Sequence, residues 1–115
     1  MGRIGRLRKG DTFDTVYREG AVIGGPLLVL RVRANGLEET RWGFAVGKRL
    51  EKRAVGRNRL RRRLREAARL TEHPKGVDIV VTARAGSLEA SFATLLLALK
   101  RGLERAGRQG QGSGT

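Results

Sequence analysis

The sequence contains no cysteine, which excludes disulfide bonds, zinc fingers and every other metal site built from thiolates. It has a single histidine, His73, and few aspartates, so no residue pattern suggests a catalytic triad or a two-metal carboxylate site. No segment approaches the ~20 consecutive apolar residues of a membrane span, and the opening MGRIGRLRKG lacks the apolar run of a secretory signal. We therefore expect a soluble, cytoplasmic protein with no membrane partner.

Acidic residues are also scarce, because 11 Asp and Glu stand against 25 Lys and Arg, for a formal net charge of +14. Arginine supplies most of the positive charge. A guanidinium group binds phosphate oxygens in pairs and stacks on bases, which favours a nucleic acid over a membrane surface as the partner. Composition alone leaves open a structural RNA-binding protein, such as a small ribosomal component, whose charge only neutralises phosphate.

The length of 115 residues is that of one domain. We expect a single nucleic-acid-binding domain over residues 1–106. Residues 107–115 are rich in glycine and have no apolar side chain, so they predict a disordered tail.

Two segments predict an antiparallel pair of strands, residues 27–34 and residues 41–48, separated by turn residues that include Gly36. Residues 21–34 also have room for an extra short strand. The near-continuous apolar run at residues 77–84 predicts a third strand, buried on both faces and central in the sheet.

Three segments predict helices. Residues 11–18 carry Phe13, Val16 and Tyr17 on one face, and Gly20 is placed to end this helix in the left-handed conformation. Residues 88–106 form a broad apolar stripe that Ser87 can cap. Residues 54–72 are amphipathic, and their predicted buried face consists of Leu60, Leu64, Ala67 and Ala68. The order is αββαβα, which predicts an α+β fold with a two-layer sandwich.

The arginine-rich segment from Lys48 to Arg69 carries the strongest functional signal. Its like charges at i and i+4 repel one another in an isolated helix, and a bound polyanion would relieve that repulsion. Asn58 suits a base edge or a ribose hydroxyl, and equally suits a helix cap. The residues predicted to bind RNA are Lys48, Arg49, Arg57, Asn58, Arg59, Arg61, Arg62, Arg65 and Arg69.

Three ordered segments carry a family resemblance: RLRKGDTFDTVYREG, RWGFAVGKRLEKRAVGRNRLRRRLREAAR and VDIVVTARAG. Together they resemble the bacterial ribonuclease P protein subunit over roughly residues 5–105. Two features depart from the family pattern. The loop from Arg49 to Arg53 is a residue longer, and Arg31 occupies a strand position where an aromatic is sometimes found.

The resemblance implies a protein that joins a catalytic RNA to remove the 5′ leader from precursor tRNA. It implies that the RNA, with its Mg²⁺ ions, performs the hydrolysis, that the protein has no catalytic residue and binds no metal of its own, and that no protein partner is required. It also implies a left-handed βαβ crossover in a ribosomal protein S5 domain 2-like fold. The implied leader cleft consists of Phe13, Tyr17, Arg31, Lys48, Arg61, Arg65 and Arg84.

Overall fold

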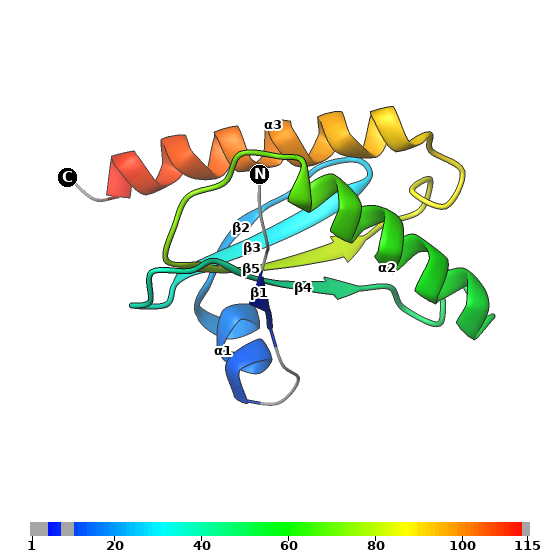
Figure 1. The fold of residues 1–115 in the computed structure, drawn as a ribbon, viewed down its shortest axis with the longest axis horizontal. Coiled ribbons are helices and arrows are strands. Elements are labelled where there is room, and N and C mark those ends of the chain that lie inside the picture. Colours follow the sequence, from blue (N-terminus) through cyan, green and yellow to red (C-terminus); the bar gives the residue numbers. More distant parts are fainter. Residues whose placement is uncertain (1–4, 8–10, 114–115) are drawn as a thin grey trace.

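The computed structural model describes residues 5–7 and 11–113, and these form one five-stranded sheet and three helices. Helices α2 and α3 cover one face of the sheet and α1 lies on the other (Figure 1). The predicted α+β class is confirmed. The elements are, in chain order, β1 (Gly5–Arg6), α1 (Asp11–Glu19), β2 (Ala21–Ile23), β3 (Leu28–Ala34), β4 (Arg41–Ala45), α2 (Ala54–Arg69), β5 (Val77–Ala83) and α3 (Phe92–Ser113).

The strand order is β1-β4-β5-β3-β2, which corrects one prediction. Strands β3 and β4 do not pair with each other, because β5 lies between them, antiparallel to β3 and parallel to β4. The physical reason is the apolar run of β5, since Ile79, Val80 and Val81 are fully buried and only a central position covers both of its faces. The predicted central strand and the extra short strand, β2, are confirmed.

The parallel pair β4 and β5 is connected by α2, which makes a βαβ crossover of the kind that the resemblance implies. The buried face of α2 consists of Leu60, Leu64, Ala67 and Ala68, as predicted. This face packs in the main core together with α3 and with Trp42 and Phe44 of β4. The core therefore fixes α2 beside β4, and the polar face of α2 is left outside.

A smaller apolar cluster on the opposite face holds α1 against the sheet, and it contains Leu7, Val16 and Val80 with Phe13 packed against them. Gly20 follows α1, but the prediction that it is left-handed was wrong, since its φ is not positive. Its N–H donates to Val16 O at 2.9 Å, and a Cβ at Gly20 would lie 2.6 Å from that oxygen. Glycine is therefore required at this position because any side chain would collide with the Val16 carbonyl oxygen.

Two predicted boundaries of the last helix were wrong. Ser87 does not cap it, because its hydroxyl donates to Arg84 O, and the cap is Ser91, whose Oγ accepts the Thr94 N–H at 3.1 Å. At the other end α3 continues to Ser113, beyond the end predicted at residue 106. No proline interrupts this stretch, and each added turn pairs backbone groups that a tail would leave to water.

Candidate nucleic-acid interface

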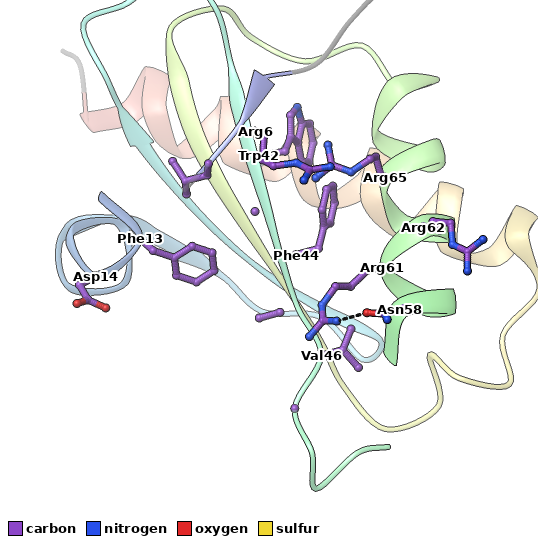
Figure 2. Close-up of a pocket in the computed structure, with 14 residues that line it drawn as sticks. Arg6, Phe13, Asp14, Trp42, Phe44, Val46, Asn58, Arg61, Arg62 and Arg65 are labelled. Carbon is purple, nitrogen blue, oxygen red and sulfur yellow. Dashed lines mark hydrogen bonds between the residues drawn. The ribbon is translucent and has the colours of Figure 1, made fainter. Parts of the chain in front are cut away.

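A groove runs along β4 between α1 and α2, and we call it the β4 groove (Figure 2). Side chains from β4 alternate between its two walls, so that Gly43 lies toward α1 while Trp42 and Phe44 pack toward α2. The lining residues are Arg6, Leu7, Phe13, Asp14, Trp42, Gly43, Phe44, Ala45, Val46, Gly47, Asn58, Arg61, Arg62 and Arg65.

The α2 wall of the groove brings together Asn58, Arg61, Arg62 and Arg65, which recur at three- and four-residue spacing along the helix. Arg61 Nη1 donates to Asn58 Oδ1 at 2.8 Å, so these two side chains form one polar unit. The alternative that Asn58 caps the helix was wrong. Helix α2 begins at Ala54, and Asn58 lies a full turn inside it.

Arg65 lies over the floor of the groove, with its guanidinium carbon 5.1 Å from the centroid of the Phe44 ring. The Phe44 ring in turn stacks on Trp42 at 5.9 Å. Burial lowers the pKa of Arg65 below its usual value, and the positive charge of Arg6 lowers the pKa further. Among the residues that the structure describes, no ion pair neutralises Arg61, Arg62 or Arg65. The wall therefore presents unpaired cations and suits an anion.

The α1 wall is aromatic. Phe13 lies so close to β4 that a Cβ on Gly43 would be 2.6 Å from its Cε2 atom, which explains why glycine stands there. Tyr17 stacks on Phe13 at 5.6 Å, and the Arg31 guanidinium lies 4.5 Å from the Tyr17 centroid. The Tyr17 hydroxyl is 3.1 Å from Thr82 Oγ1. Tyr17 is thus fixed on the open face of the sheet beside the groove.

Two of the predicted leader-cleft residues, Lys48 and Arg84, follow the ends of strands and do not line the β4 groove. Lys48 and Arg84 are exposed and follow β4 and β5, which end at the same edge of the sheet because they are parallel. Arg84 Nη1 donates to Gly25 O at 3.2 Å. The β4 groove brings Phe13, Arg61 and Arg65 together but does not include Tyr17, Arg31, Lys48 or Arg84.

The remaining predicted RNA-binding residues are placed differently from one another. Arg57 donates to backbone carbonyls of the loop before α2, and Arg69 pairs with Glu66, which raises the pKa of Arg69. Arg49 and Arg59 are exposed. Arg59 lines a separate hollow on the far side of α2. The arginine segment is therefore not one uniform surface.

Sequence reasoning missed Arg6 of β1 and Leu7, the residue that follows this strand, which both line the groove. β1 has only two residues, Gly5 and Arg6, and pairs parallel with the start of β4. A strand of two residues is too short to show the alternation of apolar and polar residues that predicts a strand from sequence. The alternating Trp42 and Phe44 were a usable signal, since two aromatics on one face of a strand next to an arginine helix can form an aromatic floor.

Three further observations bear on function. In the described part of the chain, no group of three or more His, Asp or Glu side chains is arranged to hold a metal ion. Helices long and apolar enough to cross a membrane are absent from residues 5–7 and 11–113. The His73 ring lies nearly perpendicular to the Trp42 ring, with their centroids 5.5 Å apart, and His73 Nδ1 lies 2.9 Å from Thr71 O. It is a packing residue in the loop after α2.

Comparisons with known proteins agree with this geometry. The family model described as Ribonuclease P matches residues 1–107. The chain is 40% identical over 112 residues to the ribonuclease P protein component of Gluconacetobacter diazotrophicus, covering 94% of this chain and 96% of the relative. The solved structure of the ribonuclease P protein from Thermotoga maritima superposes with a TM-score of 0.79 at 33% identity, covering 87% of this chain and 96% of the other. The Staphylococcus aureus ribonuclease P protein gives a TM-score of 0.78 at 26% identity, over 90% and 96% of the two chains. The chain belongs to the ribonuclease P protein family.

Proposed function

We propose that this chain is the protein subunit of a cytoplasmic ribonuclease P ribonucleoprotein and assists removal of the 5′ leader from precursor tRNA. The observation that carries the proposal is the β4 groove, with unpaired arginines on one wall and an aromatic ring on the other. The arginine wall supplies charge for phosphates, and aromatic rings supply stacking surfaces for unpaired bases. Membership of the ribonuclease P protein family supports an RNA as the partner.

The two walls suit two RNA surfaces. Arg61, Arg62 and Arg65 project from α2, where they can contact the backbone of the catalytic RNA. Phe13 and Tyr17 lie on the opposite side of β4, beside the open face of the sheet, where a single-stranded leader can lie. Stacking and backbone contacts tolerate differences in base sequence, and the leaders of different precursor tRNAs require that tolerance.

The hydrolysis itself is assigned to the RNA subunit and its Mg²⁺ ions, as the family resemblance implies. The protein's part is to bind the two RNAs and to position the precursor. Each phosphate that the protein neutralises lowers the repulsion between the precursor and the catalytic RNA, and therefore lowers the Mg²⁺ concentration needed for RNA folding and precursor binding.

The alternative that the protein is itself a nuclease predicts cleavage of precursor tRNA by the protein alone. We expect a preparation free of contaminating nucleases to show no such cleavage.

Tyr17 provides the test that separates leader binding from general RNA binding. We expect Tyr17→Ala to weaken binding of precursor tRNA to the holoenzyme by about 1 to 3 kcal/mol, the usual value for removal of a base stack. Mature tRNA, which lacks the leader, should bind as before. Fluorescence titration of the two RNAs against wild-type and variant holoenzyme measures both affinities.

Tyr17→Phe is the matched control, because it keeps the ring and removes only the hydroxyl that reaches Thr82. We expect it to keep most of the precursor affinity. Equal losses for precursor and mature tRNA in Tyr17→Ala would remove Tyr17 from the leader site. The arginine wall could still bind the catalytic RNA in that case.

A further inference from the structure

The loop between β4 and α2 contains four of the chain's cations, and it is fastened to α2 by the chain itself. Within the loop the N–H groups of Leu50 and Glu51 both donate to Gly47 O, at 3.1 and 3.2 Å. Helix α2 then starts with no side-chain cap and no acidic residue in its first turn. Other contacts must therefore hold the loop to the helix.

Arg57 makes the first of these contacts. Its Nη1 donates to Glu51 O at 3.0 Å and to Lys52 O at 2.8 Å, so one guanidinium nitrogen joins two successive loop carbonyls. The Arg57 side chain is half-buried, whereas the Arg59 side chain, two positions on, is exposed and makes no hydrogen bond to the described residues. The two arginines of the Arg-Asn-Arg triplet are therefore not equivalent.

Gly56 makes the second contact possible. The Glu51 side chain, only 16% exposed, lies directly on Gly56, where an added Cβ would be 2.7 Å from Glu51 Cγ. In that position Glu51 Oε1 accepts from Arg53 Nε at 3.0 Å and from Arg53 Nη2 at 2.8 Å. We call this arrangement of Glu51, Arg53, Gly56 and Arg57 the loop lock.

We infer that Arg57 and Gly56 are positioning residues, which hold the loop at residues 48–53 so that its exposed cations, Lys48, Arg49 and Lys52, meet the catalytic RNA in a preformed arrangement. The inference rests on the proposed function and makes it more specific. A loop fixed before binding avoids the entropy cost of ordering it on the RNA. Arg57 then contributes to RNA affinity by holding the loop in place, and Arg59 contributes to RNA affinity by its own charge.

Gly56→Ala tests the lock without changing any charge, and it favours the helix by propensity while displacing Glu51. We expect about tenfold weaker binding to an in vitro transcribed bacterial ribonuclease P RNA, the equivalent of ordering roughly one residue. Gly107→Ala in α3 is the matched control, because nothing lies within 4 Å of its added Cβ. We expect it to bind as the wild type does. Unchanged affinity in Gly56→Ala would overturn the inference.

Arg57→Gln and Arg59→Gln form a second pair that stays informative if Gly56→Ala does not fold. Arg57→Gln should weaken affinity while the slope of log affinity against log salt stays near wild type, and Arg59→Gln should lower that slope by about one unit. Hydrogen exchange of the free protein should speed up at the amides of residues 50–53 only in Arg57→Gln. A slope lowered by one unit together with unchanged exchange in Arg57→Gln would show that Arg57 is a direct phosphate contact. If wild-type protein fails to bind the RNA, the proposed function fails, while the exchange comparison still decides the lock.

Discussion

Replacing Arg61, Arg62 and Arg65 together by glutamine should weaken binding to a bacterial ribonuclease P RNA by about 100-fold or more at moderate salt, since each charge-assisted hydrogen bond contributes about 1.5 to 3 kcal/mol. All three side chains line the β4 groove, and none is neutralised by a carboxylate of the described chain. The slope of log affinity against log salt should fall by about 2 to 3 units, close to one for each phosphate that the variant no longer neutralises. Filter-binding titrations at several salt concentrations measure both quantities.

The control for this variant removes the same charge from elsewhere. Lys75, Lys100 and Arg101 are exposed, lie outside the β4 groove, and can be replaced by glutamine in the same way. We expect this control to reduce affinity by only a small factor, through the net charge of the protein. Equal losses in the two variants would mean that RNA binding follows total charge, as in a structural RNA-binding protein that only neutralises phosphate.

Asp78→Ala should lower the free energy of unfolding by about 3 kcal/mol, because it removes a buried carboxylate and leaves its half-buried donors without an acceptor. Asp78 is 1% exposed and accepts from Arg41 Nε and Nη2, both at 2.8 Å, and from Asn35 Nδ2 at 2.9 Å. The hydrogen bond to Asp78 raises the pKa of Arg41, which keeps the guanidinium charged. Urea denaturation followed by circular dichroism measures the loss.

Glu19→Ala is the comparison for Asp78→Ala. It removes the exposed ion pair with Arg33, in which the side chains are 38% and 55% exposed. Surface pairs of this kind contribute roughly 0 to 1 kcal/mol. A loss from Asp78→Ala no larger than that from Glu19→Ala would show that the Arg41–Asp78 pair does not stabilise the junction of β4 and β5.

The helices and the central strand could be predicted because their signals are local. Leu60 and Leu64 recur at the helical period, and the consecutive apolar residues Ile79 to Val81 of β5 do not alternate with polar ones. The pairing of strands could not be predicted in the same way. Nothing in the sequence of β3 and β4 indicates that β5, more than thirty residues later, lies between them, because insertion of a central strand depends on burial of the whole sheet.

The residues of the site could be predicted from the sequence, but their arrangement in space could be predicted only in part. Asn58, Arg61, Arg62 and Arg65 were among the residues predicted to bind RNA, and all four line the groove. Arg57 belongs to the same segment, yet its guanidinium is used within the protein, because the loop before α2 offers two free carbonyls within its reach. Such use depends on loop conformation, which residue spacing does not encode.

The central claim is that this chain acts as the protein subunit of ribonuclease P, and reconstitution tests it most directly. Precursor tRNA cleavage by a bacterial ribonuclease P RNA should be measured across a Mg²⁺ titration at moderate salt, with and without the protein, and with the protein alone. We expect the protein to shift cleavage to lower Mg²⁺, to tighten precursor binding, and to cleave nothing by itself. An RNA whose Mg²⁺ requirement and precursor affinity are the same with and without the protein would contradict the account.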